Sequence, residues 1–167
     1  QLLSFVGERT IEAFEKVDSA YLRYFRIGED TGWFKVNHLE EKNALEITVN
    51  LSNYIHLKEV IQRIRVMFDI DCNWQQIYSD LSDTPKLKQV MDSNPGMRLP
   101  GSWDPFEFSI RAILGQQISV KAATTLANRI VNSFGSSTNI DGKKIHLFPT
   151  PEQLTGVDFT KIGVTRK

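Results

Sequence analysis

The sequence predicts an α+β fold, in which an antiparallel sheet is covered by helices and followed by the first helices of an all-α region. Three observations lead to this prediction. Successive runs within residues 21–51 alternate apolar and polar side chains, which is the period of half-buried strands. Residues 53–68 repeat apolar side chains at helical intervals. Two more helical patterns, 105–115 and 119–134, each begin with a capping residue.

Composition limits the class of protein. The 167 residues are 41% hydrophobic and 24% charged, which suits one domain, or one domain and part of another. No run reaches the roughly 18 apolar residues of a membrane span, and a signal-peptide pattern is missing, so we expect a cytoplasmic protein with no membrane partner. The single cysteine, Cys72, excludes an internal disulfide and a four-cysteine iron–sulfur cluster within these residues. We therefore predict no cofactor and no metal.

The charge distribution gives a small hint about partners. The formal net charge is zero, which by itself argues against a nucleic-acid binder. Up to Val90, however, 11 basic and 14 acidic residues give −3, and the remainder has 9 basic and 6 acidic residues and carries +3. The basic excess coincides with the two helical patterns at 105–115 and 119–134.

The N-terminal elements are predicted from their periods. A short amphipathic helix is expected over residues 2–9, and the chain opens inside that pattern without an initiator methionine, which suggests a fragment of a longer chain. Residues 21–27 and 33–39 are extended runs, and residues 45–51 alternate strictly between apolar and polar. Short turns between these three runs predict an antiparallel meander.

A helical region follows the predicted strands. The helix at 53–68 has one apolar stripe, and we expect it to cover the sheet. Shorter helices are predicted at 74–81 and after a cap at Thr84. Residues 94–96, Asn-Pro-Gly, interrupt regular structure, so we place a domain boundary near Ser93. That boundary divides the chain into domains 1–93 and 94–167.

The most informative stretch contains the two predicted helices at 105–115 and 119–134. Asp104 can accept a hydrogen bond from the Glu107 backbone N–H, and Pro105 suits the first helical position. Glu107 can reach back and complete a capping box. Gly115 can take positive φ after the last turn, and Ser119 can cap the second helix.

The connection between these helices consists of Gln116, Gln117 and Ile118. Adjacent glutamines offer amide donors and acceptors and have little reason to be buried. Two interpretations remain open at this point: a solvated interhelix turn, and a loop that binds a partner.

After the second helix, the sequence predicts mainly irregular structure. Residues 135–142 are rich in Gly, Ser, Thr and Asn, which is typical of a surface loop. Lys143, Lys144 and His146 follow, and we expect His146 to face solvent. Thr150 then begins another short helix.

Three motifs carry a family resemblance: R-L-P-G at 98–101, A-I-L-G-Q-Q-I-S at 112–119 and F-P-T-P-E-Q-L at 148–154. In this order and spacing they resemble the AlkA type of 3-methyladenine DNA glycosylase II, of the helix-hairpin-helix superfamily. The resemblance covers essentially the whole chain but only the first part of a family member. It implies an N-terminal domain similar to one half of the TATA-binding protein. It also implies a monomeric base-excision repair enzyme that flips alkylated bases, such as 3-methyladenine, out of double-stranded DNA and hydrolyses their N-glycosidic bonds.

The resemblance also assigns residues. Gln117 matches the wedge that enters the duplex, with an amide where the best-known member has an apolar side chain, and Gln116 is its neighbour on the DNA. Ser119 and Lys121 lie at a helix start that would contact phosphate. Phe5 matches an aromatic residue of the base pocket, although a core phenylalanine is an equally good interpretation of that position.

A catalytic residue is not expected within this chain. Asp104 and Glu107 lie near the motif, but capping accounts for both. The family's catalytic aspartate and its phosphate-binding hairpin would lie beyond Lys167. We therefore expect these residues alone to be inactive, and the alternative function is a non-catalytic DNA- or protein-binding module that shares the fold.

Overall fold

The structure is a computed structural model that describes residues 2–164, and it confirms the α+β class. The chain forms two compact units. The larger, the sheet unit, comprises residues 3–57 and the residues from Asp104 on, and the smaller, the helical unit, comprises Lys58–Trp103. The domain boundary near Ser93 remains a prediction, because units defined by packing need not coincide with functional domains.

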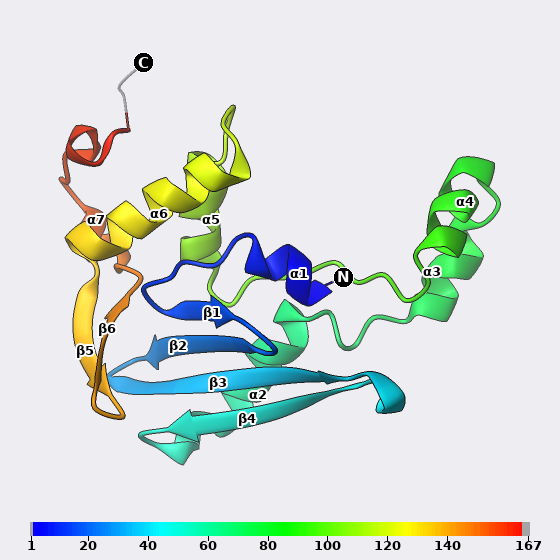
Figure 1. Ribbon diagram of the computed structural model, residues 1–167, viewed down its shortest axis with the longest axis horizontal. Coiled ribbons are helices and arrows are strands. Elements are labelled where there is room, and N and C mark those ends of the chain that lie inside the picture. The colour runs from blue at the N-terminus through cyan, green and yellow to red at the C-terminus, as the bar shows by residue number, and fades with distance from the viewer. Residues whose placement is uncertain (1, 165–167) are drawn as a thin grey trace. The chain divides into compact units, whose positions relative to one another are not determined.

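The sheet unit is built on a four-stranded antiparallel sheet, drawn in blue to cyan in Figure 1. Its strands follow the chain in order, as the meander predicted, and a short strand is added at the start. The strands are β1 (Glu15–Val17), β2 (Tyr21–Ile27), β3 (Asp30–Leu39) and β4 (Ala44–Leu51). Ile27 pairs with Asp30, so the β2–β3 turn has two residues, and Gly28 takes φ 59° there.

One face of β2 is fully buried. Tyr21, Phe25 and Ile27 are the apolar residues of this face, and Arg23 lies between them on the same side. The rings of Tyr21 and Phe25 pack on Phe34 of β3, at centroid distances of 5.8 and 6.0 Å. An arginine on such a face must find buried partners, because an isolated buried charge is costly.

The helices after Asp104 share a core with the start of the chain. Helix α1 (Leu2–Gly7) lies near the start of the chain. The helices after Asp104 are α5 (Pro105–Leu114), α6 (Val120–Phe134), α7 (Pro151–Leu154) and the 3-10 helix η3 (Phe159–Ile162). Ile11 and Phe14, which precede the sheet, pack in one cluster with Ala127, Ile130 and Val131 of α6. The segment before β1 is thus structurally part of the helical layer that follows residue 104.

One prediction in this region was wrong. Residues 135–142 do not form a loop: β5 (Ser136–Ile140) and β6 (Lys143–Leu147) make an antiparallel hairpin. Its two-residue turn has positive φ at Asp141 and Gly142, 51° and 75°, as a type I′ turn requires. The Asp141 carboxylate accepts hydrogen bonds from Trp33 Nε1 (2.6 Å) and Asn50 Nδ2 (3.1 Å), which fixes the hairpin tip to the large sheet.

The helical unit confirms three predicted helices: α2 (Leu57–Met67), α3 (Trp74–Leu81) and α4 (Pro85–Ser93). Two 3-10 turns belong to the sheet unit: η1 (Glu40–Lys42) joins β3 to β4, and η2 (Tyr54–His56) precedes α2. The R-L-P-G motif ties the helical unit together. Arg98 Nη1 donates to the carbonyls of Asp69 (3.2 Å) and Cys72 (2.9 Å), and Gly101 N donates to Met67 O (3.1 Å).

No helix within residues 2–164 is long and apolar enough to cross a membrane.

Candidate nucleic-acid interface and the ion network behind it

The exposed turn between α5 and α6, residues 115–119, brings together four of the five residues proposed to form a site. Gln116, Gln117, Ser119 and Lys121 are all exposed on this turn and the first helical turn after it. The Ser119 hydroxyl oxygen accepts from Ala122 N (3.2 Å), so the predicted cap is confirmed. The arrangement presents two amides and one ammonium group at a helix N-terminus, where backbone N–H groups also point outward.

The backbone of this turn differs from the prediction in one respect. Gly115 has φ −75° and continues the helix, whereas Gln117 takes the left-handed conformation with φ 60°. Within residues 2–164, the other non-glycine residues with positive φ are Asn43, Asp69 and Asp141, residue types that tolerate this region. Glutamine lacks the short polar side chain that stabilises it, so Gln117 is held there at a conformational cost.

Local hydrogen bonds hold the neighbouring residue. Gln116 N donates to Ile113 O (3.2 Å), and its side-chain Nε2 donates to Ala112 O (3.1 Å). Gln116 therefore extends α5 past its last regular residue. Gln117 is exposed and lies between this extension of α5 and the Ser119 cap of α6.

Phe5, the fifth proposed residue, lies on α1. Phe5 is 45% exposed, so the alternative of a core phenylalanine is wrong. The Arg9 guanidinium lies 3.7 Å from the ring centroid, and Arg9 Nη1 donates to Phe5 O (2.8 Å). Phe5 thus presents a half-exposed aromatic surface with a cation on it.

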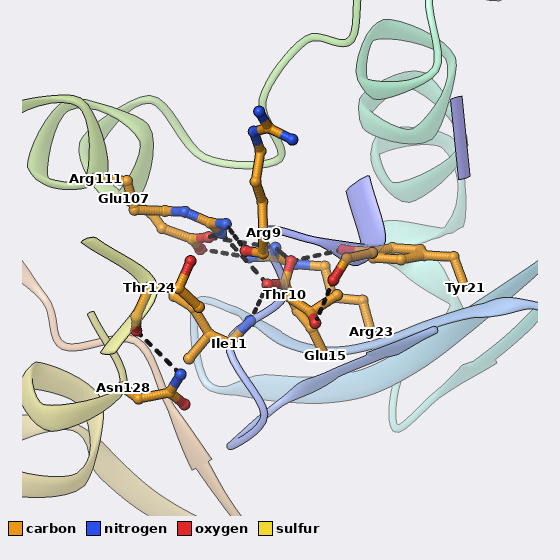
Figure 2. A network of polar contacts seen from close by, with 11 residues as sticks. Arg9, Thr10, Ile11, Glu15, Tyr21, Arg23, Glu107, Arg111, Thr124 and Asn128 are labelled. Carbon is orange, nitrogen blue, oxygen red and sulfur yellow. Dashed lines mark hydrogen bonds and ion pairs between the residues drawn. The ribbon is translucent and has the colours of Figure 1, made fainter. Parts of the chain in front are cut away.

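The helix that leads into the turn, α5, carries two residues of an ion network that the sequence did not reveal, shown in Figure 2. Glu15 of β1, Arg23 of β2 and Glu107 of α5 are buried, with side chains only 3–6% exposed. Arg23 Nη1 donates to Glu15 Oε1 (2.6 Å), and its Nη2 forms a short ion pair with Glu107 Oε2. The Tyr21 hydroxyl donates to Glu15 Oε1 (2.7 Å), and Ile11 N donates to Glu15 Oε2 (2.8 Å).

Arg111 completes this network from the last turn of α5. Its Nη1 reaches both carboxylates, at 2.9 Å from Glu107 Oε1 and 3.3 Å from Glu15 Oε2. Its Nη2 donates to the carbonyl of Arg9. Two carboxylates and two guanidinium groups balance each other, as a buried charge cluster requires.

The predicted role of Glu107 is corrected in part by this network. Asp104 Oδ1 does accept from Glu107 N (2.8 Å), so the cap itself is confirmed. The Glu107 carboxylate, however, does not complete a capping box, because it points inward and pairs with Arg23 and Arg111. The sequence signal for this network was Arg23, a charged residue on the same face of β2 as its buried apolar residues.

The contacts of Glu15 and Tyr21 shift the pKa values of both groups. Burial alone raises the pKa of Glu15, but Arg23 and Arg111, with hydrogen bonds from Tyr21 and Ile11, bring that pKa below its ordinary value of 4.5. Burial, and then the Glu15 charge, hold the pKa of Tyr21 well above 10.0. Glu15 is therefore ionised and Tyr21 neutral near pH 7, and Tyr21 donates its hydrogen bond to an anion.

The part of the chain that the structure describes contains no group of three or more His, Cys, Asp or Glu side chains placed to hold a metal ion.

Solved structures of DNA glycosylases have this architecture. The fold matches a 3-methyladenine DNA-glycosylase from Archaeoglobus fulgidus with a TM-score of 0.78 and 22% identity, over 98% of this chain and 57% of that one. An 8-oxoguanine glycosylase/lyase from Clostridium acetobutylicum, solved with double-stranded DNA containing cytosine opposite 8-oxoG, matches with a TM-score of 0.60 and 20% identity. That match covers 89% of this chain and 58% of the other. The fold is therefore one found in DNA glycosylases.

The family is shown by sequence. The chain belongs to the AlkA N-terminal domain family, whose model matches residues 1–104. It is 31% identical over 158 residues to DNA-3-methyladenine glycosylase 2 of Escherichia coli (strain K12), covering 94% of this chain and 54% of that protein. It is 32% identical over 150 residues to the probable bifunctional transcriptional activator/DNA repair enzyme AlkA of Mycobacterium tuberculosis (strain ATCC 25618 / H37Rv), over 89% of this chain and 30% of that one. The family resemblance is thus confirmed, and the chain spans about half, or less, of these relatives.

Proposed function

We propose that residues 1–167 form the N-terminal part of a base-excision repair DNA glycosylase that removes alkylated bases, such as 3-methyladenine, from double-stranded DNA. The observation that carries this proposal is the exposed α5–α6 turn with Gln117 at φ 60°, in a chain of the AlkA N-terminal domain family. Two relatives, DNA-3-methyladenine glycosylase 2 of Escherichia coli and DNA-3-methyladenine glycosylase of Bacillus subtilis, support the substrate class. The enzyme flips the damaged nucleotide out and hydrolyses its N-glycosidic bond.

Gln117 is the wedge in this proposal. A residue that enters a duplex must project from a backbone that does not yield when the base stack resists. Gln117 meets this need, because it sits between α5, extended by the Gln116 hydrogen bonds, and the Ser119 cap of α6. Its amide fills the space of the extruded base and hydrogen-bonds the unpaired partner base.

The start of α6 binds the DNA backbone. The N–H groups of its first turn point away from the 15-residue helix and carry its positive dipole end. Ser119 uses one oxygen lone pair for its cap and keeps its hydroxyl proton for a phosphate oxygen. The Lys121 ammonium adds a charge that acts on any sequence, because phosphate contacts carry no base information.

Phe5 contributes to the base pocket. Arg9 covers one face of its ring, at 3.7 Å from the centroid. A flipped base would stack on the other face. An alkylated, positively charged purine is a good partner for an aromatic ring, because the ring face attracts cations.

The catalytic group lies outside residues 1–167 in this proposal. Hydrolysis requires a carboxylate near the sugar to stabilise developing positive charge. The nearby Asp104 already accepts its capping bond, and Glu107 is neutralised by Arg23 and Arg111. The same facts favour the second candidate, a non-catalytic DNA- or protein-binding module. The proposed glycosylase works as a cytoplasmic monomer without a cofactor, and its catalytic domain begins near Ser93.

The two candidates differ in base release. The intact protein that contains these residues is incubated with methylated duplex DNA, and free 3-methyladenine is quantified by chromatography. A glycosylase releases the base, whereas residues 1–167 alone do not. An intact protein that binds methylated duplex but releases no base would establish the binding module instead.

The role of the turn is tested with a matched pair of variants, Gln117→Ala and Lys121→Ala, in the intact protein. Loss of the wedge costs about 1 to 2 kcal/mol, or roughly five- to thirtyfold in affinity, on duplex but not on single strands. Loss of the lysine weakens both kinds of DNA equally and flattens the salt dependence by about one unit of slope. If Gln117→Ala binds every substrate like the parent, the turn is only a connection between helices.

A further inference from the structure

The ion network includes two residues of α5, the helix that leads into the proposed DNA-binding turn. Arg111 is on the last turn of α5, and its backbone carbonyl accepts the hydrogen bond of Gly115 N (3.0 Å). The next residues along the chain are Gln116 and Gln117. A displacement of Arg111 is therefore passed through one hydrogen bond to the start of the turn.

The Arg111 side chain connects that point to distant parts of the chain. It pairs with Glu15 of β1, 96 residues away, and donates to the Arg9 carbonyl, 102 residues away. Glu107, one turn earlier on α5, pairs with Arg23 across 84 residues. These contacts attach α5 to the sheet at two successive turns of one helical face.

We propose that Arg111 is a positioning residue, which together with Glu15 and Glu107 fixes the α5–α6 turn at the orientation needed to enter duplex DNA. This inference rests on the proposed function of the turn. Arg111 touches no DNA in it and acts only through α5. The planar guanidinium suits the task, since it serves the carboxylates with one nitrogen and a carbonyl with the other, which a lysine ammonium at one point cannot do.

Stability alone is a weak reason for such a network. Buried ion pairs cost desolvation, and apolar side chains of similar volume often hold two elements together equally well. What charged and directional bonds add is one preferred geometry, because a small shift leaves a buried charge unpaired. The left-handed Gln117 needs a fixed surrounding for the same reason, since its backbone relaxes where neighbours allow it.

The first measurement needs no DNA. Amide and carbon NMR shifts of Gln117 in the 167-residue chain report its left-handed conformation. We expect Arg111→Met to move or broaden the Gln117 signals, and Arg111→Lys to restore them only in part. The matched control is Arg129→Met, which removes another arginine that donates to a backbone carbonyl, that of Ile162 (3.0 Å). It should leave the Gln117 signals unchanged.

The second measurement uses the intact protein. Affinity for damaged duplex relative to single-stranded DNA should fall about tenfold in Arg111→Met, because misplacement of a group by a distant substitution is costly. Urea unfolding of both variants separates this effect from lost stability. The inference is overturned if Arg111→Met keeps the duplex preference and the Gln117 signals. If Gln117→Ala also leaves the duplex preference intact, the proposed function of the turn fails instead, and the Gln117 signals still decide whether Arg111 positions it.

Discussion

Arg23→Met is expected to destabilise the chain strongly, because it breaks two buried ion pairs. Arg23 pairs with Glu15 Oε1 at 2.6 Å and with Glu107 Oε2 at shorter range, and all three side chains are at most 6% exposed. The variant leaves two buried carboxylates with one cation, Arg111, whose side chain is 25% exposed. Removing one partner of a buried ion pair costs about 3 to 5 kcal/mol. The free energy of unfolding should fall by that amount.

Urea unfolding followed by tryptophan fluorescence measures this loss. With a slope of about 2 kcal/mol/M, a loss of 4 kcal/mol lowers the midpoint by roughly 2 M. Lys88→Met is the control, because Lys88 forms an exposed pair with Asp92 (2.7 Å) four residues away on one helix. Its midpoint should move much less, since exposed pairs contribute little.

The pH dependence of the stability loss in Arg23→Met shows whether an unpaired buried carboxylate causes it. In the unsubstituted chain the pKa of Glu15 is below 4.5, so its contribution to stability is fully present above about pH 4.5 and is lost as pH falls further. In Arg23→Met the Glu15 carboxyl stays buried but loses its main charge partner, so its pKa rises and the variant takes up a proton on folding. Each pH unit below such a raised pKa recovers about 1.4 kcal/mol per carboxylate. The deficit should therefore shrink between pH 7 and pH 5. A deficit under about 1 kcal/mol, or one that is the same at both pH values, would refute this reasoning.

Three further predictions concern separate features. Gln117→Gly relieves the left-handed backbone and should stabilise the chain by up to about 1 kcal/mol in urea unfolding while weakening duplex binding; a destabilised variant would show that no strain is held there. The pKa of Asp71, lowered by its exposed pair with Arg65, should return to its ordinary value in 1 M salt in an NMR titration, whereas that of a buried carboxylate should not; a salt-independent value contradicts this. Gly101→Ala places a Cβ 2.6 Å from Val66 O and should destabilise the helical unit by more than about 1 kcal/mol; an unchanged midpoint would show that the backbone adjusts freely.

Periodic elements were predictable because their signals are local. Three strands alternate every two residues, and helices α4, α5 and α6 begin directly after the predicted capping residues. The hairpin after α6 was missed because Ser136–Ile140 is polar, and composition outweighed turn chemistry. Asp141 and Gly142 form the dipeptide typical of a two-residue hairpin turn, so the signal was present.

The network could not be predicted in the same way, because its partners are distant in sequence. Arg23 on the buried face of β2 predicts that an anion lies nearby, but not which one. Glu107 had a complete local explanation as a capping residue, and 84 residues separate it from Arg23. A local motif that is satisfied by its backbone alone leaves the side chain free for a contact that only the tertiary structure defines.

Taken together, the turn and the ion network favour a DNA-binding wedge over a solvated connection between helices. A solvated connection between two helices needs neither a glutamine at φ 60° nor, on the helix that leads into it, a cluster of four charges of which three are buried. Glycine would relieve the first and apolar side chains would replace the second, and both changes are expected to be neutral or stabilising. Features that cost stability are typical of sites whose geometry serves a function. A wedge is such a site, because it must hold its position while the base stack that it opens tends to close again.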